Sequence, residues 1–591
     1  MNGRSLIRCF FDVGLILILS TSCSNAQPDT QTAPFTTPED TIQLKPHAEY
    51  ISEETRLYQR IRQTDFRRDA VQDVRRFYAL PQERGKTLSV GDTRDGFLIH
   101  GMAFPFPSTV ARQLPVQYER GLIYGTPDLM TLLEDTAKKM HATYPETWMY
   151  LGNMGAREGG DIPYSVSHNA GRDADIAFYL LDEQGRFATP QNMYKIDKHL
   201  KSRGAEADYR FDVEKNATLL ETLLMHETVA VQFIFVAKHL RRALYDELVR
   251  RERPQEVLDR FAQTVQNQSA HDDHFHVRIY CSDDDIRAGC MDRSTIHPWE
   301  RDPEPVRTRA IENFRAILTD DNADFESQKV ALQRLDLLGV ARENADLILS
   351  FLPSPDAEVR ATAAKTAKKL GGRAVDPLIQ RLDGEDDVAV RVAILETLAT
   401  LDGAQIQKTF IAKLPDASPE EQRVMTHYIE HHPTKEDLNA LILAFEKSPQ
   451  NRELIRAIEV VANRSFCETA EDDDACLEEI RAWQKKNGKK KRAQWILEGF
   501  QRAGYDVKRL DKSSIRALLD AIDGPRFVSF NAQLTLKDIA KMTQDSLDWS
   551  IDDARWHYTR YFKHHEKKYG VDLSDRNEKG VREAQENDKT P

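Results

Sequence analysis

The sequence predicts a multidomain protein in which an α+β domain is followed by an all-α solenoid and a helical C-terminal region. Three observations lead to this prediction. The chain of 591 residues is too long for one hydrophobic core. Short β-like runs alternate with helical runs between about residues 76 and 300. Beyond residue 305, apolar residues follow helical spacing and part of the pattern recurs with a fixed period.

Composition and charge exclude several classes of protein. Hydrophobic residues make up 40% of the chain, which is enough to build packed cores, so the chain is not disordered as a whole. The mean hydropathy of −0.58 and the lack of long internal apolar runs exclude a polytopic membrane protein. The net charge of −13 argues against broad nucleic-acid binding, and we expect no nucleic-acid partner.

The start of the chain has the order of a secretory signal peptide, which we place at residues 1–26. Arg4 and Arg8 precede a short apolar run, Val13–Leu19, and small polar residues follow. Cleavage at the end of this segment or lipidation at Cys23 both fit this order. We therefore expect export to the periplasm, either as a free protein or as a lipoprotein of the outer membrane whose lipid at Cys23 is its one membrane contact.

Composition predicts the order of the remaining segments. Residues 27–75 form a tether and lead-in, of which the first part is rich in Pro, Thr and Gln. The α+β domain spans residues 76–300, and closely spaced prolines in a charged stretch end it. Helical repeats follow at residues 305–465, then a helical region at 466–574 and a polar tail at 575–591.

Hydrophobic spacing predicts individual elements of the α+β domain. The helical pattern has apolar residues three or four positions apart, and the strand pattern is a short apolar or extended run. The predicted helices are 129–140, 219–224 and 237–248, and the predicted strands are 147–151 and 231–236.

The helical region contains a repeat. Val359-Arg360 recurs as Val390-Arg391, and Leu370 recurs as Leu401, which gives a period of 31 residues. Paired helices with such a period are typical of an α-solenoid and come close to the HEAT pattern. Each unit must stack on its neighbours to bury its apolar face. Solenoids usually serve as scaffolds or binding surfaces, so these repeats are a candidate surface for a protein partner.

Four cysteines fall into two pairs, each nine residues apart: Cys281 with Cys290, and Cys467 with Cys476. Two short local loops of this kind are typical of disulfides in an oxidising compartment. The alternative is four reduced, buried thiols. A zinc cluster is not expected, because neither pair has the two-residue spacing that structural zinc prefers.

The segment 159–180, GGDIPYSVSHNAGRDADIAFYL, carries the first part of a candidate metal site. On a strand, Asp173 and Asp175 would share one face, and the aliphatic residues next to them would share the other. The carboxylates would then face a cleft. His168 comes from the turn before this strand, where Gly171 allows a tight approach.

The segment 271–281, HDDHFHVRIYC, carries the second part. On a second strand, His274, His276 and Arg278 would share one face, while the apolar residues between them share the opposite one. Two histidines two positions apart on a strand converge on one point, as imidazoles do when a sheet presents them to a metal. We expect the polar faces of the two strands to point outward together.

Histidine and carboxylate side chains around an ion with an open fourth position form a catalytic zinc site, in which the metal lowers the pKa of a bound water. The donor types suit Zn²⁺, and other divalent metals remain alternatives. A lone His-x-His pair would be weak evidence. Four clustered histidines together with carboxylates indicate a metal site more strongly.

These motifs, SxSHxxGxDxDI and HxxHxHVR with a cysteine just after the second, resemble the penicillin-insensitive murein endopeptidases. That family belongs to the metallopeptidase superfamily of lysostaphin, the D-Ala-D-Ala dipeptidases and the hedgehog signalling domain. The resemblance covers roughly residues 85–295. It implies a small antiparallel sheet with flanking helices, a Zn²⁺ cofactor, peptidoglycan as the partner, and hydrolysis of the D-Ala–diaminopimelate cross-link between stem peptides.

The resemblance also implies roles for single residues. His168, Asp175 and His276 would be the zinc ligands. His274 would lie beside the metal, as a base or as a stabiliser of the tetrahedral intermediate, and His271 would line the same pocket.

Three further residues are candidates for substrate binding. Arg278 would pair with a substrate carboxylate, or else form a surface salt bridge. Asp173 would orient a ligand histidine, or else face water. Ser165 stands where some relatives have another histidine, so the role of that histidine does not transfer to this chain. Asp272 and Asp273 are expected to shape a turn rather than to bind the metal.

The leading hypothesis is therefore an exported zinc peptidase, a murein endopeptidase, with a helical extension. The alternative is an inactive cell-wall binding or scaffold protein. The preference between D,D- and L,D-bonds, and between endopeptidase and carboxypeptidase action, stays open. Outside the α+β domain, the paired histidines His431-His432 and His564-His565 lie in charged helical segments and are expected to be solvated.

Overall fold

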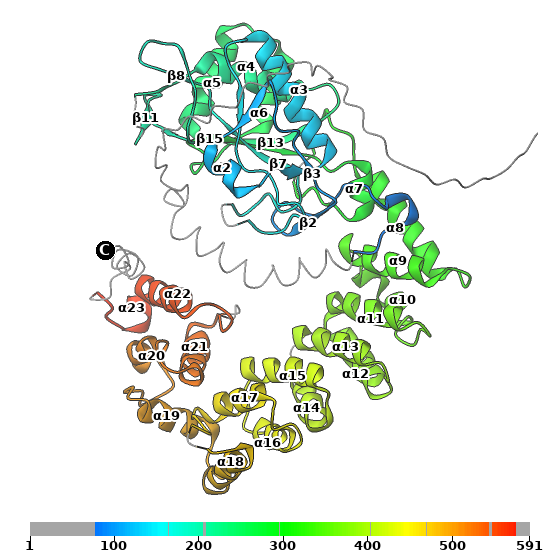
Figure 1. Cartoon of the computed structure of the whole chain (residues 1–591), viewed down its shortest axis with the longest axis vertical. Coiled ribbons are helices and arrows are strands. Elements are labelled where there is room, and N and C mark those ends of the chain that lie inside the picture. Colours follow the sequence, from blue (N-terminus) through cyan, green and yellow to red (C-terminus); the bar gives the residue numbers. More distant parts are fainter. Residues whose placement is uncertain are drawn as a thin grey trace, which may run out of the picture. The chain divides into compact units, whose positions relative to one another are not determined.

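The computed structural model describes residues 77–574, apart from 163–164, 205–207, 295, 402, 469 and 543–545. The predicted signal peptide with Cys23, the tether and the polar tail lie outside the described residues. An α+β domain comes first, and a long series of helices follows it (Figure 1). Within the described part of the chain, every helix is too short or too polar to cross a bilayer.

The centre of the α+β domain is a six-stranded sheet with the strand order β14–β13–β15–β7–β6–β4. Its strands are β4 (Ala111–Gln113), β6 (Met149–Leu151), β7 (Asp173–Ala177), β13 (Val231–Val236), β14 (Val265–Asn267) and β15 (His274–Ile279). The inner pairs are antiparallel, but both edge strands, β14 and β4, run parallel to their neighbours. The prediction of an antiparallel sheet is therefore wrong at both edges. Each edge strand is joined to its neighbour through helices, and such crossovers permit parallel pairing.

Helices pack on this sheet and share one hydrophobic core with it. Ile176 on β7, Phe275 and Val277 on β15, and Ile234 on β13 are completely buried. The helices that contribute to this core are α3 (Pro127–Thr143), α4 (Val213–Leu224), α5 (Lys238–Arg250) and α6 (Gln255–Thr264). Helix α2 (Pro115–Arg120) contributes no residue to it, and α7 (Asp283–Ala288) packs into smaller clusters through Ile286 and Ala288.

The predicted elements of this domain are confirmed with small shifts. Two of the predicted helices lie within α3 and α4, the third starts one residue before α5, and the predicted strand 231–236 is β13. The other predicted strand, 147–151, corresponds to β6, which begins two residues later than predicted. The remaining strands form small separate sheets. They are β1 (Leu88–Gly91), β2 (Gly96–Ile99), β3 (Met102–Ala103), β5 (Tyr124–Gly125), β8 (Leu180–Leu181), β9 (Phe187–Ala188), β10 (Lys195–Ile196), β11 (Ser202–Arg203) and β12 (Arg210–Phe211).

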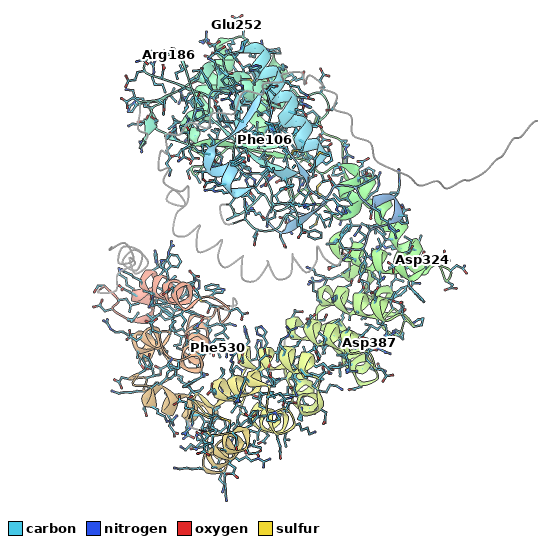
Figure 2. All side chains as sticks on the ribbon, viewed as in Figure 1. Phe106, Arg186, Glu252, Asp324, Asp387 and Phe530 are labelled. Carbon is cyan, nitrogen blue, oxygen red and sulfur yellow. A yellow bond between two sulfur atoms is a disulfide. The ribbon has the colours of Figure 1, made fainter. Side chains whose placement is uncertain are left out.

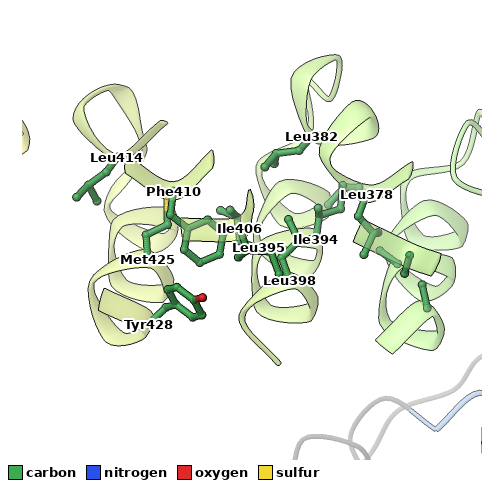
Figure 3. Packing of buried hydrophobic residues seen from close by; sticks show 14 of the residues in the cluster. Leu378, Leu382, Ile394, Leu395, Leu398, Ile406, Phe410, Leu414, Met425 and Tyr428 are labelled. Carbon is green, nitrogen blue, oxygen red and sulfur yellow. The ribbon is translucent and has the colours of Figure 1, made fainter. Parts of the chain in front are cut away.

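The region after the α+β domain is entirely helical where it is described. Its first ten α-helices are α8 (Glu304–Thr319), α9 (Phe325–Leu337), α10 (Ala345–Leu349), α11 (Ala357–Thr366), α12 (Val375–Asp383), α13 (Val388–Leu401), α14 (Ala404–Lys413), α15 (Pro419–His431), α16 (Asp437–Lys447) and α17 (Arg452–Ala462). They share one hydrophobic cluster. Leu378, Ile394, Phe410 and Met425 come from four successive helices and belong to it (Figure 3).

The repeat detected in the sequence corresponds to the first turns of helices α11 and α13, which have the same capping pattern. Asp356 caps α11 and Asp387 caps α13, because each carboxylate accepts a hydrogen bond from the amide three residues later, at 2.9 and 3.1 Å. Asp324 caps α9 in the same way, and Figure 2 labels it together with Asp387. Four residues after the later two caps, Arg360 and Arg391 each donate to two carbonyl groups of the preceding turn. Assignment to the HEAT class stays a prediction.

The C-terminal helices build a second core of their own. This core is built by α19 (Arg492–Arg502), α20 (Ile515–Ala521), α21 (Arg526–Ala540), α22 (Ile551–His564) and α23 (Glu566–Tyr569). Helix α18 (Asp473–Asn487) still belongs to the first cluster, through Cys476 and Ile480. Both predicted disulfides are confirmed. Cys281 is bonded to Cys290 and Cys467 to Cys476, with Cα–Cα distances of 6.1 and 4.8 Å.

Residues 77–83, which we predicted to begin the α+β domain, pack on helix α9. Arg334 of α9 is completely buried and donates to the Glu83 carboxylate at 2.8 Å and to the Tyr78 carbonyl at 3.0 Å. Its guanidinium also lies 4.0 Å from the centre of the Phe77 ring. A buried guanidinium needs such partners, because an unpaired buried charge is costly.

Candidate metal centre

Strand pairing brings the two chemical motifs together. β7 and β15 are antiparallel neighbours at the middle of the large sheet, with Asp175 opposite His276 and Asp173 opposite Arg278. Residues directly opposite each other project from the same face of a sheet. The polar faces predicted separately for the two segments are therefore one continuous face.

His168 reaches this face from the loop that precedes β7. Its backbone is left-handed, with φ +79°, and Gly171 in the same loop has φ +69°. A Cβ atom at Gly171 would lie 2.7 Å from the Leu98 side chain, so the loop can pack this closely only with glycine there. The Asp173 carboxylate accepts a hydrogen bond from the His168 amide at 3.1 Å and fixes the loop on the strand.

Three side chains converge on one point. Oδ1 of Asp175 lies 3.3 Å from Nε2 of His168 and 3.4 Å from Nδ1 of His276. Two ligand atoms that each lie about 2.0–2.1 Å from a tetrahedral zinc ion are about 3.4 Å apart, so these spacings are those of a ligand set.

Two of these three atoms lack hydrogen-bond partners. Asp175 Oδ1 and both ring nitrogens of His168 are buried and make no hydrogen bond among the described residues. Buried polar atoms without a partner are rare, because each one costs desolvation free energy. A cation between them would satisfy these atoms. His168, Asp175 and His276 therefore fit a divalent metal ion.

His274 lies beside this group and is held by a carboxylate. Its Nδ1 is 2.5 Å from Oδ1 of Asp273, and its Nε2 is 3.4 Å from Oδ1 of Asp175. Burial alone would lower the pKa of His274, but the two carboxylates outweigh it and raise the pKa well above its ordinary value. His274 can therefore hold a proton next to the ligand group.

His271 lies next to His274 and His276. Its ring centre is 5.0 Å from that of His274 and 5.3 Å from that of His276. Burial lowers the pKa of His271 to about 2, and the positive charges of the neighbouring histidines add to this effect. His271 is therefore neutral at physiological pH. With His274 and His276 it forms a second close group of ring nitrogens that overlaps the first.

Arg278 and Asp173 bind each other. Nε and Nη2 of Arg278 donate to the two oxygens of Asp173 at 2.7 and 3.0 Å. Asp173 is completely buried, and burial would raise its pKa, but Arg278 and His276 hold the pKa well below its usual range. The prediction that this polar face points outward is wrong for the pair, because Arg278 neutralises the carboxylate inside the domain. The geometry favours a positioning role for both residues over the predicted substrate contact.

Ser165 lies in the loop before His168. Its hydroxyl accepts a hydrogen bond from the Ser167 amide at 3.3 Å, and its backbone pairs with Ile162. Its role in substrate binding stays a prediction.

Two residues of the site were not predicted. Asp273 was expected only to shape a turn, although its position beside His274 in the HDDH run was an available signal. Asn153 donates from Nδ2 to Oδ2 of Asp175 at 3.2 Å, and its carbonyl accepts from the Asp175 amide at 2.9 Å. Asn153 comes from a distant segment that carries no local motif. Both residues orient a group at the centre, as outer partners of metal ligands commonly do.

Comparison with known proteins agrees with this geometry. Residues 89–301 match the family model described as penicillin-insensitive murein endopeptidase. The matched segment contains every residue of the site described above and ends just before helix α8. No curated protein matches the chain. The family match supports a peptidase that hydrolyses peptidoglycan in this domain.

Proposed function

We propose that the α+β domain is a zinc-dependent endopeptidase that cleaves the D-Ala–diaminopimelate type of cross-link between peptidoglycan stem peptides. One observation carries the proposal. Inside a segment that matches the murein endopeptidases, a buried carboxylate oxygen of Asp175 lies 3.3 and 3.4 Å from the ring nitrogens of His168 and His276. Two imidazoles and one carboxylate suit Zn²⁺ and leave a position open for water.

The residues around this group divide the chemistry between them. Zinc held by His168, Asp175 and His276 would lower the pKa of a water molecule and polarise the scissile carbonyl group. His274, whose protonated ring is favoured by Asp175 and Asp273, can stabilise negative charge that develops on the substrate oxygen and donate a proton from Nε2 to the departing amine. Asp273 stabilises the protonated ring and directs Nε2 towards the ligand group, because it holds Nδ1.

The other residues keep this arrangement in place. His271 is neutral, so its ring can donate one hydrogen bond to a substrate oxygen without adding a charge. Asp173 supports two ligands at once: it holds the amide of His168, and its Oδ1 lies 3.5 Å from Nε2 of His276. Arg278 supplies the charge that lets Asp173 stay buried as a carboxylate.

We also propose that the enzyme works in the periplasm, free or anchored at the outer membrane through Cys23, and that the helical region binds a protein partner. Disulfides are typical of such an oxidising compartment, and the chain forms two. All residues of the candidate metal centre lie in the α+β domain, so the surface of the helical region is available to bind a partner.

The test is digestion of purified, cross-linked sacculi by the full chain, with and without a chelator, read by mass spectrometry of the released muropeptides. We expect hydrolysis that stops with the chelator and returns with Zn²⁺. His168→Ala should abolish hydrolysis, and His199→Ala, a change at an exposed histidine of the same domain, should not. The masses identify the bond that is cut. Hydrolysis by a chelated protein or by His168→Ala would refute the proposal, and a protein without either zinc or hydrolysis would favour the scaffold alternative.

A further inference from the structure

A second group of metal-ligand side chains lies in the helical region. His427 and His431 are one turn apart on α15, so they share one face of the helix, and their ring centres are 4.3 Å apart. Asp548 joins them from the segment that precedes α22. The prediction that His431 is solvated is wrong: its side chain is only 11% exposed, because α21 packs beside it with Phe530 at 6.5 Å between ring centres. Figure 2 labels Phe530.

The side-chain types of this group match those of the first centre, but its spacing is wider and the two rings face different oxygens of Asp548. Nε2 of His427 lies 3.8 Å from Oδ2 of Asp548, and Nε2 of His431 lies 3.7 Å from Oδ1. Each residue offers a ligand atom, and the three atoms lie within 4.8 Å of one another. The separations exceed the tetrahedral value of about 3.4 Å by a few tenths of an ångström, which side-chain rotation can remove.

The segment that carries Asp548 is anchored on both sides. The Ser546 hydroxyl is 2.9 Å from Oε1 of Gln533 and 2.8 Å from the Tyr558 hydroxyl. Trp549 is buried and contacts the His557 ring at 4.9 Å. Ser546 and Trp549 thus hold the backbone on both sides of Asp548, so the Asp548 carboxylate loses little conformational freedom when it binds an ion.

A neighbouring cation, Arg526, is already neutralised. Arg526 interacts electrostatically with Asp548, but its guanidinium donates to both oxygens of Glu430, at 2.7 and 2.9 Å, and lies over the Phe530 ring. A bidentate carboxylate partner cancels most of the repulsion that Arg526 would exert on a second cation.

We propose that His427, His431 and Asp548 bind a Zn²⁺ ion that ties helix α15 to the segment before α22. Two imidazoles and a carboxylate are zinc ligands, and the exposed fractions of His427 and Asp548, 52% and 41%, leave room for water at the remaining position. The ion joins residues more than a hundred positions apart in the sequence, so it would hold the last helices against the repeats. The proposal is independent of the peptidase function.

The test is zinc stoichiometry of the full chain after loading with Zn²⁺ and dialysis, measured by elemental analysis. We expect two equivalents for the wild type, one for His431→Ala, one for His168→Ala and none for the double variant. His564→Ala, a change at an exposed histidine near the end of α22, is the matched control and should keep two. Hydrogen exchange adds a local measurement: Zn²⁺ should protect residues 426–432 and 546–550 in the wild type and in His168→Ala, but not in His431→Ala.

The outcomes separate the two zinc sites. Equal zinc content and equal protection in the wild type and in His431→Ala would overturn the second site. One equivalent in the wild type and none in His431→Ala would support it and count against the first centre instead. If His431→Ala does not fold, His427→Ala replaces it, because the His427 side chain is half exposed and its removal opens no buried cavity.

Discussion

Replacing Asp273 by asparagine tests the chemistry assigned to His274. Asp273 and His274 are both largely buried, and their charge centres lie on the order of 4 Å apart. At an effective dielectric constant of about 20, such a pair contributes about 4 kcal/mol to the stability of the protonated ring. The asparagine oxygen still accepts a hydrogen bond worth about 1 kcal/mol. We therefore expect Asp273→Asn to lose about 2–3 kcal/mol of transition-state stabilisation, which is roughly a 30- to 150-fold fall in kcat.

The assay is the rate of muropeptide release from cross-linked sacculi, together with the zinc content of each variant. Among the described residues, the Asp273 carboxylate is paired with the ring of His274 and forms no ion pair with His168 or His276, so zinc content should not change. Asp272→Asn is the matched control, because it removes a neighbouring carboxylate that does not touch the His274 ring. A kcat within twofold of the wild type would refute the role of Asp273. A loss of zinc would show that it acts through the metal ligands.

Three further changes test the remaining structure. Asp173→Asn leaves Arg278 buried without its partner, so it should lower the free energy of unfolding by about 3–5 kcal/mol, as measured by denaturation. It should also weaken zinc binding about 10- to 100-fold, as measured by zinc titration. Wild-type values for both quantities would contradict the positioning role of Asp173. Glu83→Ala should destabilise α9 by a similar amount, because it leaves Arg334 unpaired, and a thermal melt checks this while activity per folded molecule stays unchanged. Glu385 has a pKa lowered to about 2, since hydrogen bonds from its arginine partners outweigh burial. Its folded pKa lies below the unfolded value, so its stabilisation is present above about pH 4.5 and is lost as the pH falls towards 2. Glu385→Gln should flatten the fall in Tm over that range, and an unchanged slope would contradict the assignment.

Local patterns predicted the elements better than the way they pair. The spacing of apolar residues located α3, α4, α5 and β13, because amphipathic periodicity depends only on neighbouring positions. The parallel edge strands escaped prediction, since the direction of a short strand in a sheet depends on which strand it meets and not on its own residues.

The candidate site shows the same division. Alternation on two strands placed Asp175 and His276 on the polar faces of their own strands, and the resemblance to a family named them as ligands with His168. The sequence did not show that Arg278 forms a salt bridge with Asp173 inside the domain, because a salt bridge and a contact with substrate have the same sequence pattern. Asn153 could not be found at all, since its hydrogen bond to Asp175 joins segments with no common motif.

The sequence alone determined the kinds of chemical group, their spacing along each strand, the nine-residue spacing of the cysteine pairs and the 31-residue repeat. All of these can be read from the order of residues along the chain. Only the tertiary structure determined the register of β7 against β15, which places three ligand atoms within reach of one ion. It also determined how α21 and the segment before α22 pack against α15, and this packing brings Asp548 to His427 and His431. Distances between remote side chains follow from how whole elements exclude water from a shared core, and no single segment contains that information.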